Sequence, residues 1–276
     1  MCKMLGECLD RVRQRAPLVH NITNYVTAND VANLLLACGA RPIMADDPQE
    51  AAEITAHAAA LHLNLGTFSS RTVPSMLSAG EEAGRLGRPI VLDPVGVGAS
   101  PHRRRTAKAL LEALPVTVIR GNLSELRAIS HGFSTADGVD AAVSDQVDPL
   151  HPEEAAERLK AMARSMGTIL AATGGVDLVT DGVRCFVIHN GRPEMSRITG
   201  TGCQLSALTA AFLGANPERP LDAAAAAVCA MGLAGELGWA RMGPLDGNIA
   251  YRGYLIDAIY HLSGETLEKG ARYEVQ

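Results

Sequence analysis

Short apolar runs alternate along this chain with longer segments in which apolar positions recur every three or four residues. The short runs predict β-strands, and the longer segments predict amphipathic helices. The expected strands are residues 18–22, 42–45, 61–65, 89–92, 116–119 and 168–172. The expected helices between them are residues 27–38, 48–59, 71–86, 102–114, 122–130 and 152–166. Strands that alternate with helices of this length are typical of an α/β fold, and their continuously apolar character is typical of a buried parallel sheet.

The pattern changes beyond residue 173. Two strand-like segments, 177–180 and 184–189, flank an Asp-Gly dipeptide that is typical of hairpins, so we expect an antiparallel extension of the sheet. Segments 202–213, 221–239 and 249–262 predict a helical C-terminal region. No internal repeat or long low-complexity linker divides the chain, so we expect one domain over residues 1–276, with a mobile polar connection at 137–151.

The composition restricts the classes of partner. The chain has 276 residues, of which 47% are hydrophobic, and its formal net charge of −5 argues against broad binding to nucleic-acid phosphates. No secretory signal or lipid-spanning segment is recognisable, and the Ala-rich run 223–234 predicts a buried core helix. The six cysteines include no C-x-x-C pair, which favours free thiols in a reducing cytoplasm. The basic cluster 103–105 is expected in the solvated first turn of a surface helix.

The polar residues of the α/β region stand at the ends of the expected strands. In open parallel sheets, ligands bind beyond the carboxyl ends of the strands. Polar residues and glycines follow six successive expected strands, at 20–24, 44–47, 66–67, 93–96, 120–125 and 173–175. We therefore expect these segments to form the functional site. His20 is expected to be a hydrogen-bonded structural residue, with a substrate contact as the alternative.

The segment Gly200-Thr201-Gly202-Cys203 directly precedes an expected helix. Glycine lets a ligand approach the backbone closely, and the free amides and dipole of a helix start favour an anion. The pattern therefore indicates a phosphate site, although Gly-x-Gly alone is a weak signal. The chain has neither the P-loop pattern nor Gly-x-Gly-x-x-Gly after its first strand, so phosphate would be held by backbone amides with the aid of a cation.

Asp93 and Glu125 are the candidate ligands for that cation, because Mg²⁺ commonly uses one or two carboxylates and keeps several waters. Each residue also has a structural alternative. Asp93 precedes Pro94 and can cap a turn, and Asn122 with Glu125 has the spacing of a capping box. The capping role and the metal role of Glu125 are compatible.

Six segments together resemble the hydroxyethylthiazole kinase family in order and spacing. They are Val-His-Asn-Ile-Thr-Asn at 19–24, Pro-Ile-Met at 42–44, Leu-Asp-Pro-Val-Gly at 92–96, Arg-Gly-Asn-x-x-Glu at 120–125, Ala-Thr-Gly at 172–174 and Thr-Gly-Thr-Gly-Cys at 199–203. The resemblance runs over nearly the whole chain. It implies a ribokinase-like three-layer α/β/α fold with a mostly parallel central sheet and a helical C-terminal region. It also implies ATP-dependent phosphorylation of the hydroxyl group of 4-methyl-5-(2-hydroxyethyl)thiazole in thiamine salvage.

The resemblance assigns binding roles to individual residues. By this resemblance, Met44, Gly200 and Asn24 are expected to contact the thiazole. Arg120 and Thr173 are expected to contact ATP. The family also implies a homotrimer with the active site at a subunit interface.

The same resemblance assigns the catalytic and metal roles. Asp93 and Glu125 are expected to belong to the Mg²⁺ and phosphate machinery, and Gly200, Gly202 and Cys203 to act on the transferring phosphoryl group. Cys203 stands where the wider ribokinase-like group usually has an aspartate that serves as the base. It is either a base or nucleophile itself, or a residue that leaves proton removal to water and phosphate.

Three other functions are compatible with parts of the pattern. Hydroxymethylpyrimidine kinase shares the fold, but segments 19–24 and 42–44 argue against it. An NAD(P)H-hydrate dehydratase would need an acidic residue after Gly-x-Gly, where this chain has Cys203. A ligand-binding relative without activity is disfavoured because Asp93, Glu125 and the glycines are all present.

Overall fold

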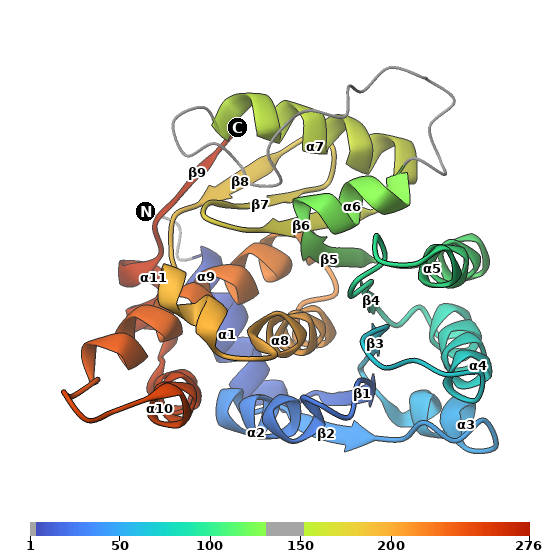
Figure 1. The fold of residues 1–276 in the computed structure, drawn as a ribbon, viewed down its shortest axis with the longest axis horizontal. Helices are drawn as coiled ribbons and strands as arrows, with labels where there is room; N and C mark the ends of the chain where they lie inside the picture. The colour runs from blue at the N-terminus through green and yellow to red at the C-terminus, as the bar shows by residue number, and fades with distance from the viewer. Residues whose placement is uncertain (1–3, 131–151) are drawn as a thin grey trace.

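A single nine-stranded sheet runs through the computed structural model, which describes residues 4–130 and 152–276. The strands follow one another in the order β2-β1-β3-β4-β5-β6-β7-β8-β9 (Figure 1). Their bounds are β1 Leu18–Ile22, β2 Arg41–Met44, β3 Ala60–Asn64, β4 Ile90–Asp93, β5 Val118–Asn122, β6 Ile169–Thr173, β7 Asp177–Thr180, β8 Cys185–Ile188 and β9 Tyr273–Val275. Strands β1 to β6 pair in parallel, and β6 to β9 pair antiparallel. The expected mostly parallel sheet and the antiparallel hairpin, which turns at Gly182 (φ 92°), are confirmed.

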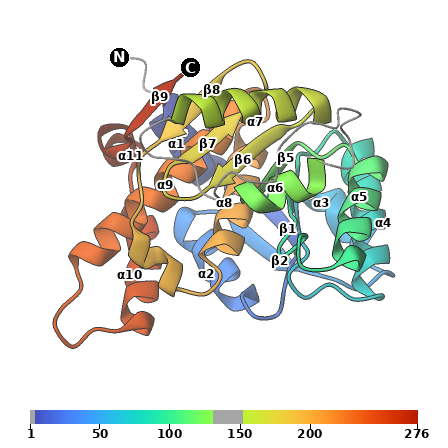
Figure 2. The ribbon, with the colours of Figure 1, turned by 45° about the horizontal axis from the view of Figure 1, so that its top comes forward.

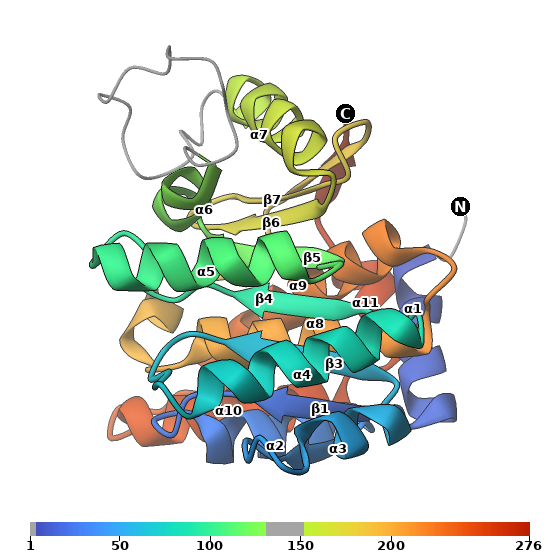
Figure 3. The ribbon, with the colours of Figure 1, turned by 90° about the vertical axis from the view of Figure 1, so that its right-hand side faces the viewer.

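Helices cover both faces of this sheet, as a three-layer α/β/α fold requires. One face carries α3 Ala51–His57, α4 Thr72–Arg85, α5 Pro101–Ala113, α6 Leu123–Ser130 and α7 Pro152–Met166 (Figure 3). Among these, α7 lies over β7 and β8 (Figure 2). The other face carries α1 Met4–Arg15, α2 Ala28–Cys38, α8 Thr201–Ala215, α9 Pro220–Ala240, α10 Asn248–His261 and α11 Gly264–Gly270. Two hydrophobic clusters, one on each face, form the core.

Helix α9 is the expected core helix. Of the helices in the described ranges, it alone is long and apolar enough to cross a membrane, and 78% of its apolar window is buried inside the protein. It packs on α8, α10 and β7, so packing explains its apolar character.

The structure contains four elements that the sequence pattern did not predict, and it extends one strand. These elements are α1, the 3₁₀ helix η1 (Pro193–Arg197), α11 and β9. Helix α1 has a recognisable signal, since Leu5, Leu9 and Val12 share one buried face. Strand β9 has three residues and depends on its pairing with β8. The expected connection at 137–151 lies outside the described residues.

The fifth strand runs beyond its expected end. We expected it to stop at residue 119, but pairing with β6 continues as far as Asn122 opposite Thr173. Arg120 therefore lies inside a strand rather than in the following loop. This pairing fixes its backbone, so the position of the Arg120 side chain is set by the sheet.

The basic cluster at 103–105 is only partly solvated, which corrects the expectation for its first member. Arg104 and Arg105 are exposed. Arg103 instead donates hydrogen bonds to backbone carbonyls of the loops after β3 and β4, and its guanidinium stacks 5.2 Å from the ring centroid of Phe68. Since both loops belong to the expected site edge, Arg103 helps to fix their shape.

Candidate active site

The glycine segment forms the start of α8, as predicted. Gly200 has φ 83°, a left-handed conformation that favours glycine, and the helix begins at Thr201. A Cβ on Gly200 would lie 2.3 Å from Cγ2 of Thr27, and one on Gly202 would lie 2.4 Å from Nη1 of Arg120. Packing and backbone conformation therefore disfavour a side chain at Gly200, and a side chain at Gly202 would have to displace the Arg120 guanidinium. The unpaired amides of a helix start favour an anion, so this segment stays the candidate phosphate site.

Asp93 ends β4 and is fully buried. Its Oδ2 accepts hydrogen bonds of 2.8 Å from Nδ2 of Asn64 and from Oγ of Ser206, and lies 3.9 Å from Nη1 of Arg120. Its Oδ1 has no hydrogen-bond partner in the described part of the chain. Burial raises the pKa of Asp93 to about 6, against the lowering effect of Arg120 and the two hydrogen bonds.

Glu125 forms the predicted capping box. The amide of Glu125 donates to Oδ1 of Asn122 over 2.8 Å, and the amide of Asn122 donates to Oε2 of Glu125 over 2.9 Å. The amide of Gly96 donates to Oε1 of Glu125 over 2.8 Å. Glu125 therefore ties the loop after β4 to the start of α6, and both its oxygens already accept backbone hydrogen bonds.

The two carboxylates fit a magnesium ion that takes few protein ligands. Within residues 4–130 and 152–276, no group of three His, Cys, Asp or Glu side chains is placed to hold a metal. Mg²⁺ usually keeps waters and binds substrate phosphates with one or two carboxylates. Oδ1 of Asp93, a buried oxygen without a hydrogen-bond partner in the described residues, is the candidate protein ligand.

The surroundings of Cys203 favour a neutral thiol. Its sulfur accepts a hydrogen bond of 3.2 Å from Nδ2 of Asn24. Burial raises the pKa of Cys203, the charge of Asp93 raises it further, and hydrogen bonds from neighbouring polar side chains lower it. The helix start alone would favour a thiolate, but burial dominates here. The arrangement supports a positioning role for Cys203 rather than a base or nucleophile.

Asn24 and Asn64 link the first strands to this centre. Oδ1 of Asn24 accepts from the amide and the hydroxyl of Thr27, and its Nδ2 donates to Oδ1 of Asn64 over 3.0 Å. Asn24 is 4% exposed. The polar groups of Asn24 are thus engaged within the protein, and its contact with the thiazole stays a prediction.

Asn64 and Ser206 both donate to Asp93, and neither was expected from the sequence as a site residue. Asn64 ends β3, directly ahead of the Gly66-Thr67 segment that the strand-end rule selected. Ser206 lies one helical turn after Gly202 and also donates to the carbonyl of Gly202 over 3.2 Å. The sequence signal for Ser206 is weak, because a serine inside a helix can have many other roles.

His20 is a structural residue, as expected. It is fully buried, and its two ring nitrogens lie 2.8 Å from Oγ1 of Thr55 and from the carbonyl of Ala45. Burial lowers its pKa, which keeps the ring neutral. Both nitrogens are engaged inside the protein, so His20 supports the loop after β2.

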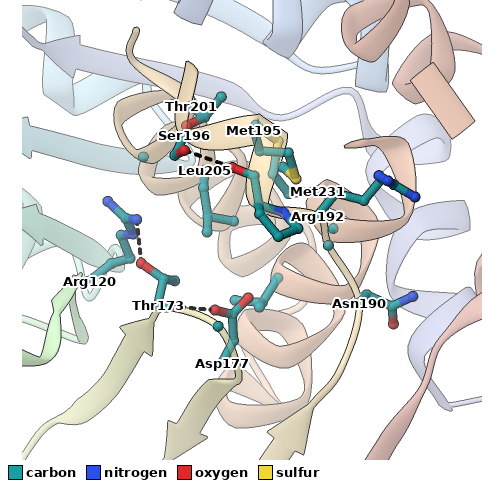
Figure 4. Close-up of a pocket in the computed structure, with 17 residues that line it drawn as sticks. Arg120, Thr173, Asp177, Asn190, Arg192, Met195, Ser196, Thr201, Leu205 and Met231 are labelled. Carbon is teal, nitrogen blue, oxygen red and sulfur yellow. Dashed lines mark hydrogen bonds between the residues drawn. The ribbon is translucent and has the colours of Figure 1, made fainter. Parts of the chain in front are cut away.

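Two cavities are lined by residues that contact Asp93, namely Arg120 and Asn64. The larger has a volume of about 510 Å³ and includes Arg120 and Thr173, which are hydrogen bonded to each other (Figure 4). The smaller has a volume of about 410 Å³ and includes Asn64 and Met44, whose side chain is partly exposed. Both cavities lie at the carboxyl-end edge of the parallel strands, where the sequence predicted the site.

A mostly parallel sheet, an anion site at a helix start and a buried aspartate beside it define a small-molecule kinase of the ribokinase-like class. A ribokinase-like superfamily protein from Enterococcus faecalis V583 shares the fold, with a TM-score of 0.64 at 12% identity over 96% of each chain.

Closer relatives define the family. A model of the hydroxyethylthiazole kinase family matches residues 9–265. The hydroxyethylthiazole kinase of Clostridium acetobutylicum is 50% identical over 98% of this chain and 99% of its own. The structure of a hydroxyethylthiazole kinase protein from Pyrococcus horikoshii OT3 has a TM-score of 0.88 at 37% identity and covers 99% of both chains. The chain therefore belongs to the hydroxyethylthiazole kinase family, and it is a kinase.

Proposed function

We propose that this kinase transfers the γ-phosphoryl group of ATP to the hydroxyl of 4-methyl-5-(2-hydroxyethyl)thiazole, as a step of thiamine salvage. The observation that carries this proposal is a pair of cavities, each lined by a residue that contacts Asp93, in a chain of this family: Arg120 lines the larger and Asn64 the smaller. The larger cavity would take ATP and the smaller the thiazole alcohol. The transfer would then occur where the two cavities approach each other, at the start of α8.

The phosphate end of the larger cavity is rich in donors. Arg120 supplies a guanidinium whose side chain is 13% exposed, and Thr173 supplies a hydroxyl beside it. The amides of residues 200–203 face the same region. Donors fixed in this way neutralise charge on the phosphoryl group without reorganising, which is commonly the largest contribution to catalysis.

Asp93 would hold Mg²⁺ through Oδ1, with Glu125 as a nearby second charge. The ion supplies positive charge to the phosphate oxygens when it is bound. Asn64 and Ser206 keep the other oxygen of Asp93 occupied, so the carboxylate cannot rotate without losing two hydrogen bonds. The donors on Oδ2 thus hold Oδ1 in one orientation.

The hydroxyl group of the thiazole would lie close to Cys203. In a loose phosphoryl-transfer transition state the alcohol proton leaves late, so a strong base adds little. The raised pKa of Cys203 supports this reading, because a thiol at neutral pH is a poor base. Cys203 and Asn24 would help to position the alcohol, and Met44 would contact the ring through its polarisable sulfur.

Exposed apolar residues beside the smaller cavity support a homotrimer with the active site at a subunit interface. Tyr25 is 82% exposed and Val26 is 58% exposed, and Tyr25 also lines this cavity. Exposed apolar side chains next to a ligand site are typical of an interface. Sedimentation velocity tests the trimer, and Val26→Asp should both dissociate it and raise the KM for the thiazole. We further propose that the chain acts as one domain, 1–276, in the cytoplasm, without nucleic-acid or membrane partners.

A coupled assay of ADP release tests the proposed function. The substrates are a panel of thiazole and pyrimidine alcohols, each with and without Mg²⁺. We expect Mg²⁺-dependent turnover with the hydroxyethylthiazole and at least about tenfold lower kcat/KM for the pyrimidine, since the wrong ring leaves polar groups unpaired. An equal or higher kcat/KM with the hydroxymethylpyrimidine would identify the protein as a hydroxymethylpyrimidine kinase instead.

A further inference from the structure

Asp177 is a half-buried carboxylate in the lining of the larger cavity, and the proposed transfer does not use it. It is the first residue of β7 and lines the cavity together with Thr173 and Gly174 (Figure 4). Its Oδ1 accepts a hydrogen bond of 2.8 Å from the amide of Gly174. A carboxylate can accept several hydrogen bonds, so the Gly174 amide leaves acceptor capacity on this side chain.

The order of the strands places Asp177 part of the way along the cavity. Strands β5, β6 and β7 are successive neighbours in the sheet, about 4.8 Å apart. Arg120 lies on β5, Thr173 ends β6, and the antiparallel register of β6 and β7 brings Asp177 next to Thr173. Figure 4 shows Asp177 between Arg120 on one side and Asn190 on the other.

The two ends of the cavity differ in chemistry. The end at Arg120 and Gly202 carries the donors described for phosphate. The rest of the lining includes the apolar side chains of Met195, Val228 and Met231 from η1 and α9, together with the polar side chains of Asn190 and Arg192. A nucleotide bound with its phosphates at the first end would place its base against these apolar side chains. Its ribose would then lie near Asp177.

We propose that Asp177 binds the hydroxyl groups of the nucleotide ribose and makes the enzyme select ribonucleotides over deoxyribonucleotides. A carboxylate that accepts hydrogen bonds from ribose hydroxyls is a common solution in nucleotide-binding α/β folds. The proposal rests on the proposed function, because it takes the larger cavity as the ATP site.

The electrostatics of Asp177 support this role. Burial raises its pKa to about 7, and the Gly174 amide and the charge of Arg120 act in the opposite direction. Cys229 faces it from α9, and burial with the charge of Asp177 raises the pKa of that thiol, so it stays neutral. Hydroxyl donors from a ribose would therefore stabilise an ionised carboxylate that its own surroundings stabilise poorly.

The alternative is that Asp177 only closes the turn at residues 174–177. Asp181 provides a matched control, because it accepts from the amides of Val183 and Arg184 in the β7–β8 hairpin and does not line the cavity. The experiment compares the wild type, Asp177→Ala, Asp177→Asn and Asp181→Asn. It measures kcat/KM with ATP, 2′-deoxyATP and 3′-deoxyATP, and binding of ADP and the deoxyADPs by calorimetry.

We expect the wild type to prefer ATP over at least one deoxynucleotide by about tenfold or more, as expected for hydrogen bonds to a charged group. Asp177→Ala should reduce that preference to near one and Asp177→Asn should reduce it in part, while Asp181→Asn keeps it. The KM for the thiazole should not change. An unchanged preference in Asp177→Ala, or a wild type that does not discriminate, would overturn the proposal.

Calorimetry separates failure of this proposal from failure of the proposed function. If no alcohol is phosphorylated but ADP still binds with a preference that depends on Asp177, the ribose contact stands and the proposed reaction is wrong. If turnover is normal but deoxyADP binds as well as ADP, the reaction stands and the ribose contact is wrong. Thermal melting of Asp177→Asn, which keeps an acceptor for Gly174, controls for loss of folding.

Discussion

Ser206 on α8 donates its hydroxyl to Oδ2 of Asp93 at the end of β4, over 2.8 Å and across 113 positions of sequence. Asn64 donates to the same oxygen. The contact joins the helix whose first amides we propose to hold phosphate with the carboxylate that we propose to hold the cation. The anion site and the cation site therefore keep one fixed relationship.

Ser206→Ala should weaken the use of Mg²⁺ and move the acid limb of the pH profile. Activity that needs ionised Asp93 is lost as the pH falls through its pKa of about 6, and the Ser206 hydrogen bond lowers that pKa. Removing the hydroxyl should move the acid limb of kcat/KM to higher pH and raise the Mg²⁺ concentration for half-maximal activity several-fold. Thr209→Ala removes another buried hydroxyl of α8 and should change neither the acid limb nor the Mg²⁺ requirement. Matching profiles for the two variants would exclude a positioning role.

Glu125→Gln should lower both the stability and the activity of the protein, and the loss of activity should be much the larger effect. The two oxygens of Glu125 accept two backbone amides, and a glutamine has one acceptor oxygen for them. We expect a loss of about 1 kcal/mol in the free energy of unfolding. Asn122→Ala breaks the same capping box but keeps the carboxylate. If both variants lose similar stability and similar kcat, Glu125 is a helix cap without a metal role.

Gly202→Ala should reduce kcat by at least about 100-fold, comparable to the loss of one oxyanion donor. The added methyl group would displace the Arg120 guanidinium and crowd the amides at the start of α8. Gly253→Ala on α10, where a Cβ meets nothing within 4 Å, is the matched control and should keep normal kcat. Steady-state kinetics that give nearly normal turnover for Gly202→Ala would move the phosphate site elsewhere.

Met44→Ala should raise the KM for the thiazole much more than the KM for ATP. Met44 lines the smaller cavity and does not line the larger one. Its loss removes sulfur contact with the ring but leaves the phosphate end intact. Equal effects on the two KM values, measured by varying each substrate in turn, would argue against ring contact.

Cys203→Ala should keep measurable kinase activity, and Cys203→Asp should be at least as fast as the wild type. Burial raises the pKa of Cys203, which favours a thiol over a thiolate and supports a mechanism that does not use a thiolate. General-base help is worth about 10²–10⁴-fold, so a missing base gives a slow enzyme rather than an inactive one. Asn24, which donates to the sulfur, can also donate to an aspartate. Steady-state kcat decides this, and an inactive Asp variant would give the sulfur a specific role.

Local patterns were sufficient for much of the fold. The Asp-Gly hairpin, the capping box of Asn122 and Glu125 and the helix start at Gly200 each depend on residues a few positions apart. Such features form from nearby backbone groups, so the sequence predicts them directly. The alternation of apolar runs with amphipathic helices also predicted the parallel sheet and therefore the edge that carries the site.

The ordered motifs of the chain also indicated its family and the type of reaction, and the family model and the relatives confirm both. The sequence could not show which donors surround Asp93, because Asn64 and Ser206 reach it from distant parts of the chain. It also left the state of the Cys203 thiol open. A helix start lowers the pKa of a thiol, whereas burial raises it. In the packed chain the effect of burial on Cys203 is the larger one.

Strand pairing determines where Arg120 and Asp177 lie. The two cavities depend in addition on the helices that pack on the sheet. The amino-acid sequence alone determined which residues stand at the strand ends. The tertiary structure decided which of them meet, because contacts between distant segments and the removal of water are properties of the packed chain.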